Sequence, residues 1–144
     1  MTVSITIDRK SVNVLVDIKT IKRKHEIALK NALNDIGSEV VNETANLIFN
    51  GPKTGRIYQY RGARHQASSP GEAPANRTGR LAKSVDYKVR SHNEMTVGES
   101  AEYAGFLENG TRKMKPRPHL IVAVQNNARN TELAILEAVE QEIS

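Results

Sequence analysis

The stretch PGEAPANRTGRLAKSV, from Pro70 to Val85, marks where the chain changes from loop to regular structure. Its first half is rich in Pro and Gly, which favour turns and disfavour helices and central strands. Its second half enters a regular element that buries Leu81 and Val85. We therefore expect the two arginines of the stretch, Arg77 and Arg80, to be carried on a loop that projects from the core.

The net charge of the protein is concentrated in the same region. The chain has 21 Lys and Arg residues against 16 Asp and Glu residues, a net charge of +5. The segment from Gly51 to Arg80 contains six basic residues and one acid, Glu72, so it carries +5 by itself. Such a loop can bind nucleic acid or an acidic protein surface, or it can simply be solvated, and the sequence leaves these alternatives open. The six basic residues are Lys53, Arg56, Arg61, Arg64, Arg77 and Arg80.

Two long segments show the periodicity of amphipathic helices. Between about residues 19 and 49, apolar residues recur every three or four positions, and Asn50-Gly51-Pro52 ends the pattern. A second apolar stripe predicts a helix from His119 to Ile143, weakened in its middle by Asn126 and Asn127. The core residues predicted from the two stripes are Leu33, Ile36, Val40, Leu47, Leu120, Val124, Leu136 and Val139.

Shorter strands are predicted where apolar and polar residues alternate. Residues 3–7 form one strand, residues 11–18 fit a strand or a helix with helix favoured, and residues 81–90 and 94–98 form a hairpin. The sequence thus predicts a single α+β domain over residues 1–144. Two long helices pack on a small, mainly antiparallel β-sheet, and residues 51–76 form a long basic loop or β-arm that projects from it.

The segment AEYAGFLENGTRKMKPRPHL, from Ala101 to Leu120, joins a short aromatic helix to a basic, Pro-rich turn. We expect the side of the helix that carries Tyr103, Phe106 and Leu107 to pack in the core. Tyr, Phe and Arg are also enriched at protein interfaces, so the same segment fits a subunit contact. The predicted contact residues are Tyr103, Phe106, Glu108, Arg112, Lys113, Lys115 and Arg117, and Gly79 and Gly110 are expected to form turns that a Cβ would disfavour.

The sequence contains no strong signature of catalysis. It has no cysteine, which excludes disulfides and thiolate chemistry, and its histidines lack the spacing of metal ligands. Glu99, Glu102 and Glu108 could supply an acid–base pair, and His65 could serve a basic nuclease loop, but exposed side chains are the commoner explanation. We therefore predict no enzyme activity, no cofactor and no metal. Neither a signal peptide nor a membrane span is expected.

The order of several short motifs resembles the neck or tail-completion family of lambdoid tailed bacteriophages, over about residues 20–142. These motifs are a Pro-Gly-x-x-Pro turn at 70–74, Thr-Gly-x-Leu at 78–81, Val-Gly at 97–98, Y-A-x-x-L-E-x-G-T at 103–111, and an Arg-Pro-hydrophobic start of the last helix, which corresponds to Arg117-Pro118-His119-Leu120. The chain departs from the family by an insertion at residues 51–69. It also has His119 where a large hydrophobic residue is more usual.

The resemblance implies a structural protein of the virion that assembles in the host cytoplasm. Such proteins form homo-oligomeric rings around the DNA channel at the head–tail junction and link the head connector to the tail. The implied partners are further copies of the chain, other neck, connector and tail-tube proteins, and DNA passing through the lumen without being read; no membrane is involved. The alternatives are a small nucleic-acid-binding module that uses residues 51–80 and, as a weaker hypothesis, a small hydrolase or nuclease.

Overall fold

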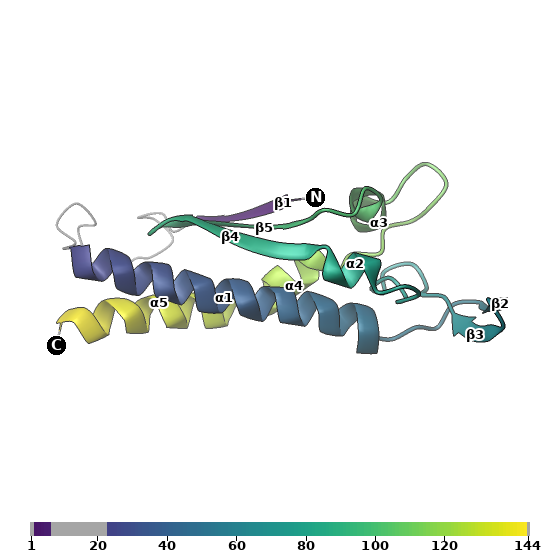
Figure 1. Ribbon diagram of the computed structural model, residues 1–144, viewed down its shortest axis with the longest axis horizontal. Coiled ribbons are helices and arrows are strands. Elements are labelled where there is room, and N and C mark those ends of the chain that lie inside the picture. The colour runs from purple at the N-terminus through teal and green to yellow at the C-terminus, as the bar shows by residue number, and fades with distance from the viewer. Residues whose placement is uncertain (1, 7–22, 144) are drawn as a thin grey trace.

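The structure is a computed structural model that describes residues 2–6 and 23–143, and it has the mixed helices and antiparallel strands of the α+β class. A small sheet lies on one side of the long N-terminal helix, and the C-terminal helix runs along another side of that same long helix (Figure 1). In chain order the elements are β1 (Thr2–Thr6), α1 (Arg23–Asn50), β2 (Ile57–Tyr60), β3 (Ala63–Gln66), α2 (Arg80–Lys83), β4 (Val85–Ser91), β5 (Glu94–Glu99), α3 (Ala104–Asn109), α4 (Leu120–Asn126) and α5 (Ala128–Ile143).

The long helix α1 forms because one side of it buries a regular apolar stripe. Leu33, Ile36 and Val40 are almost completely buried, as their helical spacing predicts. The stripe continues through Thr44, a polar residue that is also fully buried because its hydroxyl donates a hydrogen bond to the Val40 carbonyl at 2.7 Å. A polar side chain can therefore occupy this core when it bonds back to its own helix.

The main sheet has the strand order β1-β5-β4, and both strand pairs are antiparallel. Met95 and Val97 on the central strand are fully buried in the core that the sheet shares with α1, α4 and α5. Gly37 allows α1 to approach the sheet closely, because a Cβ at this position would lie 2.3 Å from the Tyr87 ring. The β4–β5 hairpin agrees with the predicted one except at its start.

The start of that hairpin corrects a sequence prediction. We expected a strand from Leu81, but residues 80–83 form the short helix α2 and the strand begins at Val85. Gly79 precedes the helix with φ 76, and Leu81 and Ala82 are buried in a small second cluster around Ile48. Burial of two consecutive residues on one side of the chain requires a helical turn rather than a strand, whose successive residues point to opposite faces.

The C-terminal helix is divided at Asn127 into α4 and α5, where a single helix was expected. The buried stripe passes through Asn127, whose side chain donates to the Ala123 carbonyl at 2.8 Å. Consequently Ile135 is buried, whereas Leu133 is exposed and the predicted core residue Leu136 is only half-buried.

The remaining core predictions agree with the structure. Leu120 and Val139 are buried, and Leu47 and Val124 are partly buried against the core. The helix predicted for residues 11–18, the first residues of the long helix at 19–22, and Ile7 lie outside the described residues.

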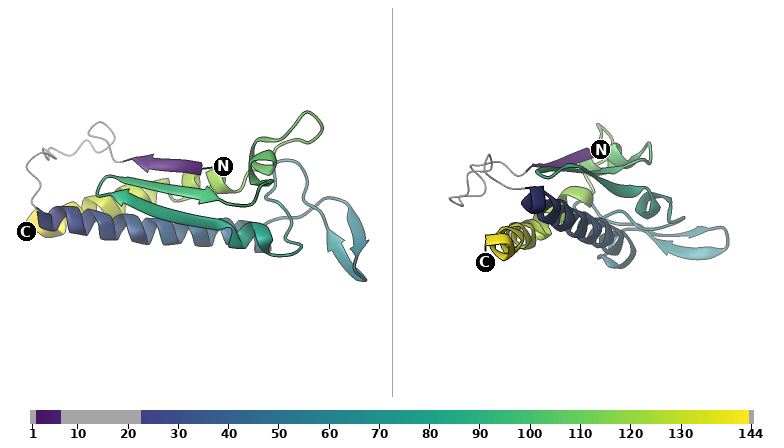
Figure 2. Two further views of the ribbon diagram at one scale, coloured as in Figure 1. Left: turned by 45° about the horizontal axis from the view of Figure 1, so that its top comes forward. Right: turned by 60° about the vertical axis from the view of Figure 1, so that its left-hand side comes forward.

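The molecule is elongated, and its two ends differ in structure (Figure 2). At one end lie the beginning of α1 and the end of α5. At the other end, the helix α3 lies level with the C-terminus of α1 with the loop of residues 110–118 next to it, and the β2–β3 hairpin extends beyond them. The segments predicted to mediate contacts therefore gather at one end of the molecule.

Candidate interaction surface

The β2–β3 hairpin, residues 57–66, is called the arm. Its two strands are antiparallel: Ile57 is paired with Gln66 at the base, and Tyr60 is paired with Ala63 next to the two-residue turn. Both turn residues have positive φ, 49° for Arg61 and 77° for Gly62, which is the requirement of a type I′ turn. Gly meets this requirement without cost, but an arginine is strained there. The chain thus places an arginine at the tip of the arm against its backbone preference.

One face of the arm is a cluster of rings and cations. Tyr58 and Tyr60 lie on either side of His65, with ring centroids at 6.1 and 5.9 Å. The guanidinium of Arg77, from the following loop, lies 4.4 Å from the centroid of the Tyr60 ring, and that of Arg61 lies 5.5 Å from it. The Arg77 contact holds the loop against the arm, whereas the Arg61 contact lies within the arm. His65 therefore packs against both tyrosine rings.

The base of the arm is held by Glu72, the one acid of the basic segment. Its carboxylate accepts hydrogen bonds from the Thr54 hydroxyl at 2.6 Å, the Ser69 N–H at 2.8 Å and the Thr54 N–H at 3.0 Å. The bond from the Thr54 hydroxyl, followed by those from the two backbone groups, lowers the pKa of Glu72. Glu72 thus positions the arm by joining the loop that enters it, at Thr54, to the loop that leaves it, at Ser69.

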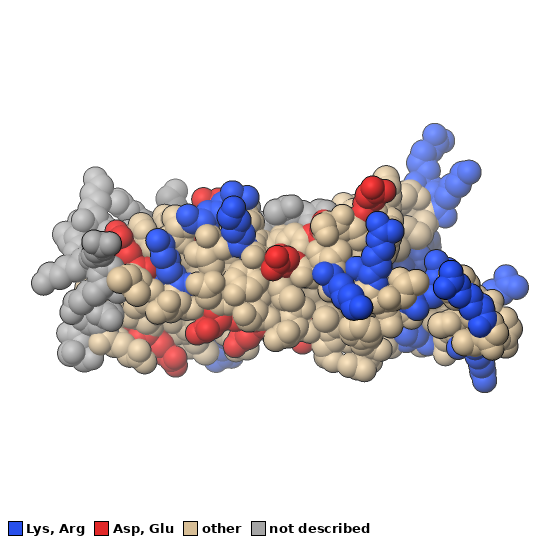
Figure 3. Space-filling view, in the orientation of Figure 1, with Lys and Arg blue, Asp and Glu red and all other residues tan. Residues whose placement is uncertain are grey.

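The two basic segments, residues 51–80 and 110–118, are bonded to each other, and together they are called the basic end. Arg117 donates to the Ser68 hydroxyl at 2.9 Å and to the Ser68 carbonyl at 3.2 Å, and the Gly71 N–H donates to the Pro116 carbonyl at 3.0 Å. The second segment adds four basic residues and no acid. Figure 3 shows Lys and Arg side chains crowded around this end, while acidic and basic side chains are interspersed over the rest of the visible face.

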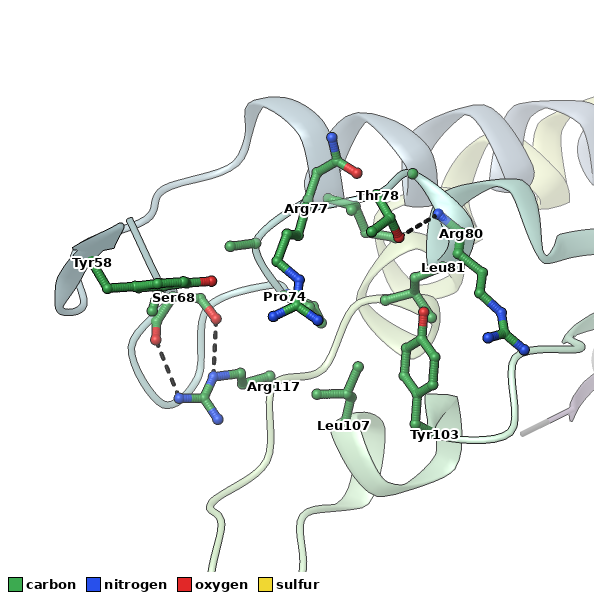
Figure 4. Close-up of a pocket in the computed structure, with 15 residues that line it drawn as sticks. Tyr58, Ser68, Pro74, Arg77, Thr78, Arg80, Leu81, Tyr103, Leu107 and Arg117 are labelled. Atoms are coloured by element: carbon green, nitrogen blue, oxygen red, sulfur yellow. Dashed lines mark hydrogen bonds between the residues drawn. The ribbon is translucent and has the colours of Figure 1, made fainter. Parts of the chain in front are cut away.

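A pocket of about 300 Å³ opens between the arm and α3 (Figure 4). Its apolar lining includes Leu81 and Leu107, and the side chains of Arg77, Arg80 and Arg117 are arranged around it. The pocket therefore combines an apolar floor with a cationic rim.

Most of the predicted contact residues are exposed at this end. Arg56, Arg61, Arg64, Arg77 and Arg80 are exposed, as are Arg112, Lys113 and Lys115. Tyr103 and Phe106 are 38% and 61% exposed, which corrects the prediction that they pack in the core, whereas Leu107 is partly buried against the cluster around Ile48. The helix instead buries Ala104 and Glu108.

Three predicted contact residues have structural partners instead. The Lys53 ammonium donates to the Leu47 and Gly51 carbonyls at 3.1 and 3.0 Å and so caps the end of α1. Its pKa is lowered, because burial outweighs the opposing effect of the Glu72 charge. Arg117 is half-buried on Ser68. Glu108 is buried, which corrects its assignment to a subunit surface.

Glu108 belongs to a buried ionic cluster with Glu99 and His119. The His119 ring places Nε2 2.5 Å from a Glu99 oxygen and Nδ1 3.0 Å from a Glu108 oxygen. The Glu108 carboxylate also accepts the N–H groups of His119, Leu120 and Ile121, at 3.1, 3.1 and 2.9 Å. It thereby satisfies the free backbone donors at the start of α4. The cluster ties the end of β5, the helix α3 and the start of α4 to one another.

In this cluster the carboxylates and the imidazolium stabilise each other in their charged forms. Burial would raise the pKa of Glu108, but hydrogen bonds from the His119 ring and from the Ile121 N–H outweigh it and hold that pKa at about 2. Burial would likewise lower the pKa of His119, but its bonds to Glu108 and Glu99 raise it to about 10. His119 is therefore a cation between two carboxyl groups at neutral pH.

Among the residues that the structure describes, Glu99, Glu108 and His119 form a group whose ligand atoms lie close enough together to hold a metal, within 4.8 Å of one another. Sequence spacing did not reveal this group. The ring nitrogens already have partners, Nε2 in a Glu99 oxygen and Nδ1 in the Arg117 carbonyl at 2.9 Å and the nearby Glu108 carboxylate. Glu108 also accepts three backbone donors, although the second Glu99 oxygen is buried without a hydrogen-bond partner among the described residues. The side chains are also closed to solvent, so a substrate cannot reach them. This arrangement suits a structural junction better than a metal or catalytic centre. Glu102, the third acid predicted for acid–base work, is exposed and outside the cluster.

Sequence reasoning missed the roles of His119 and Glu108. The one signal was the histidine itself, which stands where the resembled family has a large hydrophobic residue. A polar residue at a core position requires a buried partner, and that requirement could have led to the two glutamates.

A scan of the chain against family models, a search of curated proteins and a search of solved structures returned no match. Within the described residues, no helix has the length and apolar character needed to cross a membrane.

Proposed function

We propose that the protein is a ring-forming structural component of the head–tail junction of a tailed bacteriophage, acting as a neck or tail-completion protein. The observation that carries the proposal is the gathering of two basic segments, distant in sequence, at one end of the molecule. The ring links the head connector to the tail and surrounds the DNA channel, and it performs no catalysis.

The motifs behind the resemblance also form one physical unit, which supports the proposal. Glu108 of the Y-A-x-x-L-E-x-G-T motif accepts the N–H groups at the start of the helix that follows Arg117-Pro118. The Pro-Gly-x-x-Pro turn is bonded through Gly71 to Pro116. A set of motifs that cooperate in one substructure is a stronger indication of a shared architecture than the same motifs taken singly.

A ring needs two different surfaces on each subunit, because each copy contacts a neighbour on either side. In our proposal the projecting basic arm, with the exposed Tyr103 and Phe106 beside it, supplies one of them. Arginines that face the lumen would meet DNA phosphates without reading sequence.

Light scattering of the purified protein, with negative-stain images of the same peak, tests this function. We expect a closed ring with an open centre, whose subunit number sets the lumen size. A monomeric mass that persists over a wide range of protein concentration would contradict the proposal.

The exposed arginines of the arm also favour a second candidate, a nucleic-acid-binding module. This alternative predicts that the monomer binds DNA with an affinity that falls steeply as salt rises. Replacing Arg56, Arg61, Arg64 and Arg77 with Ala should then abolish binding. DNA binding that survives these four substitutions would rule the module out.

A further inference from the structure

The groove between α1 and α5 is a second candidate contact surface, and its charge is opposite to that of the arm. It has a volume of about 520 Å³ and is lined by residues from both helices. The lining is mostly alanine and isoleucine, with Asp35 and Glu137 as its charged members. Ile27 in this lining is 55% exposed, which is unusual for a large apolar side chain. The groove thus combines mostly small apolar side chains with two acidic ones.

The charge around the groove matches the charge of the arm. The helix α5 contains four acids and one base. On α1, Glu39 follows Asp35 by one turn, so both exposed carboxylates lie on the same side of the helix. The arm carries Arg61 and Arg64, both exposed, and has no acid between residues 57 and 66.

The arm of one molecule cannot contact the groove of the same molecule. The groove lies along the half of the helical layer that contains the start of α1 and the end of α5, whereas the arm extends beyond the other end of α1 (Figures 1 and 2). An acidic, partly apolar groove and a basic projection at opposite ends of one chain are suited to contact between copies.

We propose that the groove between α1 and α5 receives the tip of the arm of a second copy of this chain. Arg61 and Arg64 lie against Asp35 and Glu137, and the strained backbone at Arg61 is retained because it places this arginine at the tip. The contact joins two different surfaces, so it propagates from copy to copy and can close into a ring. The inference rests on the proposed function and specifies which surfaces meet.

Cysteine cross-linking tests the contact directly, because the chain has no cysteine of its own. Copies that carry Ala63→Cys beside the arm tip are mixed with copies that carry Asn31→Cys in the groove and are then oxidised. The matched control is Lys30→Cys, which is exposed on α1 next to Asn31 but faces β4 instead of the groove. We expect covalent dimers from the Ala63 and Asn31 pair, in a yield that falls at high salt, and only background from the Lys30 control.

Charge reversal provides the second measurement. Arg61→Glu with Arg64→Glu should reduce the native mass, and so should Asp35→Lys with Glu137→Lys. A chain that carries all four reversals should recover it, because the charges then match again. Reversals that weaken assembly separately but do not compensate in combination would overturn the inference.

The outcomes separate this inference from the proposed function. Rings that form without selective cross-linking of Ala63→Cys to Asn31→Cys would overturn the arm-in-groove contact and leave the neck function standing. Selective cross-links in a closed twofold dimer would support the contact and refute the ring. A protein that remains monomeric and gives no cross-links would refute both.

Discussion

The sheet-and-helix body and the basic end of this protein are held together by different forces. The body buries a continuous apolar core between α1, the sheet and the C-terminal helices. The basic end consists largely of loop, and polar contacts position it: Glu72 at the base of the arm, Arg117 on Ser68, and the Glu108–His119 junction. Hydrophobic burial needs little precision, whereas hydrogen-bonded clusters specify one geometry. The body therefore provides stability, and the basic end provides a defined shape for contacts.

The largest expected effect comes from breaking the junction between the two regions. Glu108→Ala would leave a buried imidazolium without one of its carboxylates and three backbone N–H groups without an acceptor. We expect the free energy of unfolding to fall by about 3–5 kcal/mol, measured by denaturant titration. The control is Glu102→Ala, an exposed glutamate nearby, which should change stability by no more than about 0.5 kcal/mol. Similar losses in both variants would show that the cluster is not a structural link.

The turn after α3 should be the next most sensitive position. Gly110 has φ 76, and a Cβ there would lie 2.8 Å from the Met114 carbonyl oxygen and 2.9 Å from Pro116. Gly110→Val should therefore destabilise the protein by about 2 kcal/mol or more and prevent assembly by misdirecting residues 113–118. Gly105→Val, where a Cβ meets nothing within 4 Å, is the matched control. Normal assembly of the Gly110 variant would show that the loop does not take part.

The ionic junction should also give stability a defined pH window. A pKa lowered to about 2 means that Glu108 stabilises the fold above its ordinary value of 4.5, and that this contribution is lost as pH falls toward 2. A pKa raised to about 10 means that His119 stabilises the fold fully below 6.5, and that this contribution is lost as pH rises toward 10. The stability difference between wild type and His119→Gln should therefore shrink between pH 6.5 and 10. A difference that stays constant over this range would mean that His119 is not held as a cation.

A smaller and more local effect is expected at the base of the arm. Glu72→Ala removes the acceptor of three hydrogen bonds, so backbone amides of residues 57–66 should exchange with solvent faster. Global unfolding should hardly change, because the carboxylate is exposed and the apolar core is untouched. Acidification below pH 4.5 should loosen the arm of the wild type in the same way, since the lowered pKa links this contact to the charged carboxylate. Equal protection of the arm in both proteins would show that Glu72 does not hold it.

The smallest expected change is a gain in stability, whereas the variants above lose stability globally or in the arm. Arg61→Asn should stabilise the arm by up to about 1 kcal/mol, because Asn tolerates the positive φ of this turn better than Arg does. It should weaken assembly at the same time, since the tip loses its charge. Arg64→Asn, in a strand position without positive φ, should weaken assembly without any gain in stability. A stability gain with unchanged assembly would show that the strain at Arg61 serves no contact.

Periodicity predicted the parts of the fold that are determined locally. The stripe through Leu33, Ile36 and Val40 and the alternation that pairs β4 with β5 follow from helix and strand geometry. The predicted C-terminal stripe was wrong between Val124 and Val139, where Asn127 and Ile135 are buried and Leu136 is only half-buried. We assumed that only apolar residues continue it, whereas Asn127 enters it by bonding back to the helix.

The candidate site was predictable in composition but not in arrangement. The concentration of basic charge at residues 51–80 is visible in the sequence, yet the bonding of that segment to residues 116 and 117 depends on the folded chain. The spacing of Tyr103 and Phe106 defines a helix face, but it does not say whether that face is inside or outside. The burial of Glu108 could not be predicted from its neighbours in the sequence, because the N–H groups that it accepts lie 11 to 13 residues further along the chain.

The central claim is that the arginines of the arm serve assembly and not folding. The most direct test measures both properties in one variant, Arg61→Ala with Arg64→Ala, by thermal unfolding and by light scattering at low salt. The account predicts an unfolding temperature close to that of the wild type and a native mass reduced to the monomer. A variant that keeps the full oligomeric mass, or one that loses mass only because it unfolds, would contradict the account.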